Sequence, residues 1–254
     1  MCIRDRLHEV PLIEDLPKGF MAVRTGPRNF SWRSDKPSNL IFVEALDDGN
    51  PETNAKYRDE IFEVGYPFRQ NKVSLLKTIN RFYKIDWCND TLALGYDYWW
   101  NTRNTKTYIF SPANPNKETQ IIIDRNYQDR YNDPGSFVKR RNFYGKSILA
   151  MNKLNLYLMG DGFREDGQFP FIDQLNLKSL KKIRLYESSF KDKKEDLLDF
   201  EADNNMILTR IESASEYPNY FFRDLQTNDI TKVTDFDNPF VSIMEVSKEV
   251  IEYK

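Results

Sequence analysis

Few side chains in this sequence could carry hydrolytic or metal chemistry. The chain has one histidine, His8, and two cysteines, Cys2 and Cys88. A Ser-His-Asp triad needs a histidine to accept the serine proton, and a zinc site of the Cys/His type needs about four such ligands, or three plus water. Ser147 follows Gly145, but the second glycine of a nucleophile elbow is absent. We therefore expect no catalytic residue, no metal site and no cofactor in this chain.

Gly160 to Gly167 is the segment richest in glycine. Its spacing matches neither a dinucleotide-binding loop nor a P-loop, and no helical pattern follows it. The segment is typical of a connection between two strands. The alternative interpretation is a loop that offers Arg164 to a carboxylate of a ligand.

Two further groups of residues resemble binding sites. Asp235, Asp237 and Asn238 imitate the start of a calcium loop, but the glycine and the distal glutamate of such a loop are missing, which favours a turn. Trp99 and Trp100 could stack on sugar or base rings. Because they lie where one strand is expected to end and the next to begin, packing between sheets is the favoured interpretation.

The composition excludes several classes of protein. The chain of 254 residues has 37 Lys and Arg against 39 Asp and Glu, a net charge of −2, so it lacks the basic excess of nucleic-acid-binding proteins. With 40% hydrophobic and 14% aromatic residues it can build a core. No apolar run approaches the roughly 18 residues of a membrane span, and no signal peptide is visible. Both a cytoplasmic and an exported location stay open.

Short apolar segments separated by polar turns predict an all-β fold. Only 190–198 and the last dozen residues have a pattern that could form a helical turn. The expected strands are 40–45, 60–64, 73–78, 91–95, 105–110, 120–124, 147–151, 155–159, 171–175, 182–186, 206–211, 220–224 and 230–234.

The segments also repeat. An aromatic residue, a polar turn and a strongly apolar strand recur at Trp32, Trp87, Phe143 and Phe200, about 55 to 57 residues apart. A unit of this length has room for four strands, which is typical of a β-propeller blade. A β-sandwich with evenly spaced turns is the alternative. We predict about four blades of a larger β-propeller, forming an open arc, with repeats near 20–80, 81–136, 137–190 and 191–245.

Several sequence words resemble the β-propeller domain of glutamyl endopeptidases, a branch of the prolyl oligopeptidase family of serine peptidases. These words occur in order over about residues 20–254, and it is their combination that is specific. They are Ser31 to Ser38 with Phe42 to Ala45, Trp87 to Leu94, Thr102 to Pro112, Asp133 to Ser136, Pro170 to Asp173, Ile230 to Asn238 and Lys248 to Lys254.

The resemblance implies a non-catalytic propeller that admits peptides to an α/β-hydrolase domain, which carries the Ser, Asp and His triad and follows in the same chain. Residues 1–7 do not resemble the family and are expected to be a non-native or disordered leader, with 8–254 forming a partial propeller that ends at the junction to that domain. The parent enzyme would cleave after acidic residues. Arg164, Arg103 and Arg130 are candidate partners for an acidic substrate side chain.

Two other functions stay open at this stage. The chain could be a stand-alone propeller that acts as a binding scaffold without catalysis. It could also be a sugar-active propeller that uses Trp99 and Trp100.

Overall fold

The computed structural model describes residues 8–10, 12, 14, 16–68, 71–239, 251 and 253. The elements of this described part are all β-strands, paired antiparallel, which confirms the predicted all-β class. It contains no helix with the length and hydropathy that crossing a bilayer requires. The leader 1–7 lies outside the described residues, as does the predicted junction 248–254 except for residues 251 and 253. The chain divides into two compact units, Met1–Arg130 with Lys139–Leu149, and Tyr131–Val138 with Ala150–Lys254.

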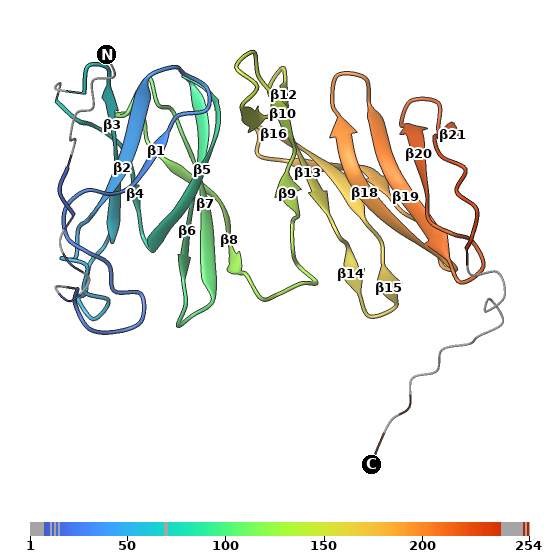
Figure 1. Cartoon of the computed structure of the whole chain (residues 1–254), viewed down its shortest axis with the longest axis horizontal. Helices are drawn as coiled ribbons and strands as arrows, with labels where there is room; N and C mark the ends of the chain where they lie inside the picture. Colours follow the sequence, from blue (N-terminus) through green and yellow to red (C-terminus); the bar gives the residue numbers. More distant parts are fainter. Residues whose placement is uncertain are drawn as a thin grey trace. The chain divides into compact units, whose positions relative to one another are not determined.

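The first unit contains two four-stranded sheets and a hairpin (Figure 1). In each sheet the strands lie side by side in chain order, the meander typical of a propeller blade. The first sheet is β1 (Arg28–Trp32), β2 (Asn39–Ala45), β3 (Asp59–Gly65) and β4 (Val73–Thr78). The second sheet is β5 (Arg81–Asn89), β6 (Leu92–Trp99), β7 (Asn104–Phe110) and β8 (Gln120–Asn126), and the hairpin is β10 (Lys139–Arg141) with β11 (Ser147–Leu149).

The second unit also contains two larger sheets. In one of them, β12 (Met151–Asn152), β13 (Asn155–Gly160), β16 (Phe171–Asn176) and β17 (Lys182–Glu187) are joined by β9 (Ser136–Phe137), which pairs with β13. A small hairpin, β14 (Phe163–Arg164) with β15 (Gly167–Gln168), lies between β13 and β16 in the sequence. The other sheet is β18 (Lys193–Glu201), β19 (Met206–Ser213), β20 (Asn219–Asp224) and β21 (Ile230–Lys232). The prediction of about four blade-type sheets is confirmed.

Each unit has a core in which two sheets pack together. In the first unit, Ile61 and Leu76 from the first sheet pack with Trp87, Ala93 and Phe110 from the second. In the second unit, Tyr157 and Ile172 pack with Phe200 and Ile207. Strands β2, β6 and β13 carry runs of three or four consecutive buried residues, so both faces of these strands are covered, which explains why continuous apolar runs predicted them well.

Some of the predicted elements are wrong. The segment 190–198 is no helical turn, because Lys193–Glu201 forms β18, paired with β19 along its length. The expected strand 147–151 is two strands, β11 and β12, which belong to different units. Phe143 does not mark a sheet as the other repeated aromatic residues do. It lies in the turn between β10 and β11 and is 99% exposed.

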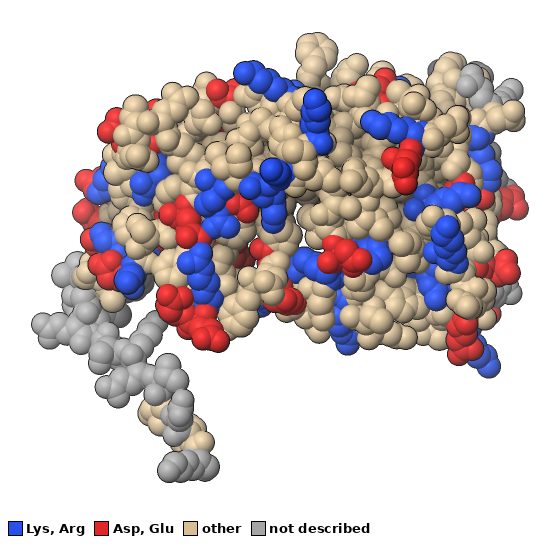
Figure 2. Space-filling model, turned by 180° about the vertical axis from the view of Figure 1, so that it is seen from behind, with Lys and Arg blue, Asp and Glu red and all other residues tan. Residues whose placement is uncertain are grey.

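Charged side chains of both signs are scattered over the face shown in Figure 2. On the face shown in Figure 2, Lys and Arg are interspersed with Asp and Glu and do not gather by sign. This mixed distribution agrees with the small net charge of the chain.

Two of the segments that resemble the family, Ser31 to Ser38 and Trp87 to Leu94, contact each other in the first unit. Arg33, at the turn after β1, is buried, and its Nε and Nη2 donate to Asp35 at 3.0 and 2.6 Å. Its Nη1 donates to Glu63 at 2.9 Å and its Nη2 also to Asp90, in the turn after β5, at 3.1 Å. The guanidinium lies 4.3 Å from the centre of a ring of Trp87. The segments around Trp32 and Trp87 therefore form a contact between the first sheet and the second.

Three tyrosines predict a loss of stability at high pH. Burial, and next to it a neighbouring carboxylate, raises the pKa of Tyr96, Tyr108 and Tyr186 above the usual value of about 10. A group with a raised folded pKa contributes stability that is present below its unfolded pKa and lost above it. The free energy of unfolding should therefore fall between about pH 10 and pH 11. Urea unfolding across this range, with absorbance of the phenolate, measures the effect.

The slope of that loss should depend on the buried rings. Tyr186→Phe removes a hydroxyl that donates to Glu195 at 2.7 Å and should make the loss shallower by up to about 1.4 kcal/mol per pH unit. Tyr144→Phe, at an exposed turn, is the matched control. An identical slope in wild type and Tyr186→Phe would contradict the prediction.

Candidate functional site

A hollow of about 430 Å³ lies at one edge of the second unit. The register of the sheet places it there, because Gly160 at the end of β13 pairs with Phe171 at the start of β16, and Phe171 pairs with Glu187 at the end of β17. The connections 161–170 and 188–192 therefore both leave the sheet at the same end of its strands. Residues 166–169 and 190–194 line the hollow.

Gly162 is required for the shape of the first connection. Its φ is 64°, and a Cβ added there would lie 1.8 Å from the carbonyl oxygen of Phe169. The Phe169 amide also donates to the Gly162 carbonyl oxygen at 2.9 Å and closes the loop around the β14–β15 hairpin. The interpretation of the glycine-rich segment as a connection between two strands is confirmed.

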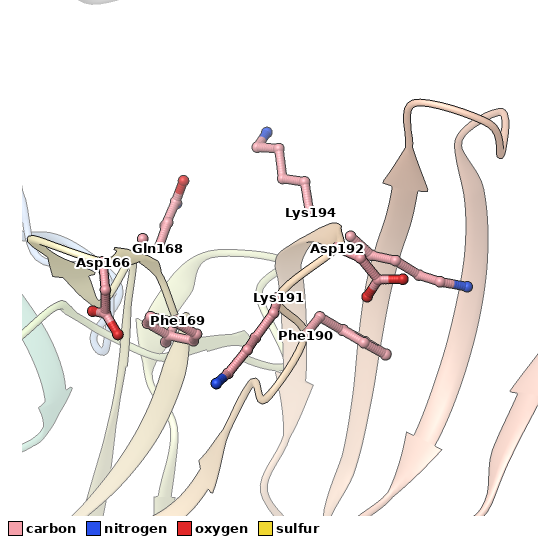
Figure 3. A pocket seen from close by; sticks show the side chains of 9 residues that line it. Asp166, Gln168, Phe169, Phe190, Lys191, Asp192 and Lys194 are labelled. Atoms are coloured by element: carbon pink, nitrogen blue, oxygen red, sulfur yellow. The ribbon is translucent and has the colours of Figure 1, made fainter.

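The walls of the hollow combine phenyl rings with charges of both signs. In Figure 3, Asp166, Gln168 and Phe169 stand on one side and Phe190, Lys191 and Lys194 on the other. Among the described residues no group of three or more His, Cys, Asp or Glu could hold a metal ion.

Arg164 lies on β14, just before the turn that lines this hollow. Its side chain is 49% exposed, forms an ion pair with Glu187 and lies 5.2 Å from the centre of the Phe169 ring. Arg184 contacts the same Glu187 and also Asp173, the latter at 2.5 Å. Because exposed ion pairs contribute little, Arg164 can exchange Glu187 for the carboxylate of a ligand at small cost.

Arg103 and Arg130 belong to the first unit, whereas Arg164 belongs to the second. Arg103, at φ 56°, donates from Nη1 to the carbonyl oxygen of Trp100 at 2.5 Å, and its guanidinium lies 3.8 Å from the centre of that indole. The amide of Tyr127 donates to the Arg103 carbonyl at 2.8 Å, so the turn that leads to Arg130 lies beside Arg103. Substrate binding by these three arginines stays a prediction.

The other candidate residues have structural surroundings. Trp99 ends β6 and is covered by the guanidinium of Arg58, which precedes the third strand of the first sheet and lies 4.0 Å away. Trp100 packs at 5.1 Å against Phe20. Asp235 follows β21 and forms an ion pair with Lys232, but the described residues 233–238 contain no turn, so the predicted turn is wrong in this respect.

Sequence reasoning did not single out the lysines at 191, 193 and 194, which line the hollow. Lys193 Nζ lies 2.6 Å from Glu216 Oε1 and Lys194 Nζ 2.9 Å from Asp196 Oδ2. The run of charged residues at 191–195 could have pointed to these lysines, but it lies in the segment 190–198, for which the sequence pattern predicts a helical turn.

Comparison with known proteins gives a likeness by sequence over nearly the whole chain. No family model matches the chain. The chain is 31% identical over 268 residues to a probable chloroplastic glutamyl endopeptidase of Arabidopsis thaliana and 31% identical over 264 residues to one of Oryza sativa subsp. japonica. Each alignment covers 98% of this chain and 28% of the relative, so the chain spans about a quarter of their length. The resemblance predicted from the sequence words is confirmed.

Solved structures give weaker likenesses. Dipeptidyl peptidase 4 of Porphyromonas gingivalis matches with a TM-score of 0.46 and 12% identity, over 81% of this chain and 30% of that chain. An oligogalacturonate lyase in complex with manganese matches with a TM-score of 0.47 and 10% identity, over 83% and 55%. At this level the structural likenesses carry no argument about function.

Proposed function

We propose that this chain, a homologue of the glutamyl endopeptidases over nearly its whole length, is the non-catalytic, substrate-gating propeller part of a serine endopeptidase. The observation that carries the proposal is sequence similarity along 98% of the chain to proteins of that name, joined with four blade-type sheets. Peptide-bond hydrolysis belongs to an α/β-hydrolase domain elsewhere in the same polypeptide. His8 alone cannot supply a triad here.

The gating role rests on size exclusion. A propeller that covers the active site admits extended peptides, excludes folded chains and limits the access of water to the reaction. In the full-length enzyme, a cleavage sequence in a free peptide should be cut at least about 100-fold faster than the same sequence inside a folded, disulfide-closed domain. Reduction and unfolding of that domain should restore the peptide rate. Equal rates for the free peptide and the folded domain would contradict gating.

Preference for acidic residues would come from arginines of the propeller. Arg164, Arg103 and Arg130 are the proposed partners of the substrate carboxylate, and a charge-assisted hydrogen bond contributes about 1.5–3 kcal/mol. Replacing the residue responsible with glutamine should therefore lower the ratio of kcat/KM for Glu over Gln peptides by at least about tenfold.

Each arginine is changed separately in the full-length enzyme, with matched peptides that differ only in Glu or Gln at the cleavage position. Arg141→Gln is the control, because Arg141 lies on exposed β10 and its Nη1 donates to the carbonyl oxygen of Gly145. An unchanged preference in all three variants would remove the proposed role of these arginines. Reading the gene beyond Lys254 for Gly-x-Ser-x-Gly with later Asp and His tests the larger proposal, which a stop codon there would overturn in favour of a free scaffold.

A further inference from the structure

The first unit holds a buried cluster in which arginines outnumber their carboxylate partners. Arg28 Nη2 lies 2.6 Å from Asp59, and Arg58 Nη1 lies 2.7 Å from Asp47. Arg81 Nη1 contacts both carboxylates, at 2.8 Å from Asp47 and 3.1 Å from Asp59. Three guanidinium groups therefore share two carboxylates, and the cluster carries an excess positive charge away from bulk water.

Two groups of this cluster have no partner among the described residues. They are Nη1 of Arg28 and Nη2 of Arg81, both buried. The two side chains are only 6% and 3% exposed. A buried donor without an acceptor costs about 1–3 kcal/mol, and more when it is charged, so native structures rarely leave one unsatisfied.

The same two side chains line a hollow of about 380 Å³. Arg24, a third arginine, also lines it and is half-buried. Phe20, Phe82 and Tyr98 contribute aromatic surface. The hollow thus combines several cationic donors with apolar walls, and its volume suits a ligand of small size.

We propose that this hollow binds a carboxylate whose short aliphatic stem packs against the aromatic rings. A carboxylate accepts two parallel hydrogen bonds from a guanidinium and would neutralise the excess charge. The inference goes beyond the proposed function, because Arg164, Arg103 and Arg130 do not line this hollow. An acidic side chain and the carboxyl end of a peptide present the same group, and the experiment separates the two.

The test is calorimetric titration of the full-length protein with small probes. N-acetyl-glutamate N-methylamide presents a side-chain carboxylate, N-acetyl-alanine a terminal one, and N-acetyl-glutamine N-methylamide is the neutral match. One of the two carboxylates should bind at least about tenfold more tightly than the glutamine probe, and the tighter of them identifies the source. Equal binding of the glutamine probe, no binding of either carboxylate, or equal binding of sulfate would overturn the proposal.

Two variants locate the binding in this hollow. Ala22→Phe fills it without changing any arginine, and Arg24→Gln removes a guanidinium that is only half-buried, so that both should leave the fold intact. Each should weaken the carboxylate probe at least about tenfold, whereas Arg141→Gln on exposed β10 should not. Unchanged affinity in both variants, or an equal loss in Arg141→Gln, would overturn the proposal. Because the readout is binding, its failure is distinct from a failure of the proposed peptidase role.

Discussion

Arg33→Ala should lower the free energy of unfolding of the first unit by about 3–5 kcal/mol, because it leaves buried carboxylates without their cation. The Arg33 side chain is 1% exposed, and those of Asp35 and Glu63 are 4% and 12% exposed. The change also removes a guanidinium from the face of Trp87. Urea unfolding followed by tryptophan fluorescence measures the loss, since Trp87 is buried at the cluster.

Two substitutions test the cause of that loss. Arg33→Lys keeps the charge but loses the paired hydrogen bonds to Asp35, so it should fall between wild type and alanine. Arg103→Ala removes an arginine that also lies on an indole but is only half-buried, and it should cost less than about 1 kcal/mol. An equal loss in the free energy of unfolding for Arg33→Ala and Arg103→Ala would show that the buried ion cluster adds no stability beyond that of a half-buried arginine on an indole.

The contacts of Arg33 connect two copies of the repeat that the sequence shows at Trp32 and Trp87. Trp32 and Asp35 stand at the same spacing as Trp87 and Asp90, and Arg33 joins the two words in space. The aromatic residues at Trp32, Trp87 and Phe200 all lie at or near the end of the first strand of a sheet. A local pattern that repeats with the sheets is visible in one sequence, so the all-β class and the number of sheets could be predicted.

Other elements could not be found in this way. The first strands β1, β5 and β18 carry many charged or exposed residues, and their pairing partner, not their own apolar pattern, fixes them as strands. Glu195 in β18 illustrates this. It is 2% exposed because Tyr186 and Thr209 donate to it from neighbouring strands at 2.7 and 2.9 Å. A buried glutamate of this kind has the sequence signal of a solvated one.

Of the candidate sites, too, one could be predicted from the sequence and the other could not. Arg164 was found because glycines surround it and mark a loop. The cluster of Arg28 and Arg81 gave no signal in the sequence, because its carboxylate partners lie 22 to 34 residues away from the arginines. Excess charge and unpaired donors are properties of the folded arrangement alone.

Asp97→Ala should cost about 3–5 kcal/mol, because this fully buried carboxylate accepts four hydrogen bonds. The amide and Nδ2 of Asn80 donate at 2.9 and 3.1 Å, the amide of Lys106 at 3.0 Å and the hydroxyl of Tyr108 at 2.5 Å. Alanine would remove the acceptor of the Asn80 and Lys106 amides and of the Tyr108 hydroxyl, whereas Asn80 Nδ2 would keep its hydrogen bond to Asn104 Oδ1 at 2.9 Å. Urea unfolding at neutral pH measures the loss.

Asp97→Asn separates the charge from the shape. Burial raises the pKa of Asp97, so wild type should lose free energy of unfolding as the pH rises above the unfolded value of about 3.9, and Asp97→Asn should lack that part of the loss. Asp124→Ala is the matched control, since Asp124 pairs with Lys106 on the next strand but is 51% exposed, and it should cost less than about 1 kcal/mol. If Asp97→Ala costs no more than Asp124→Ala, the four donors find partners elsewhere and the buried acceptor is not what holds β6, β7 and the turn at Asn80 together.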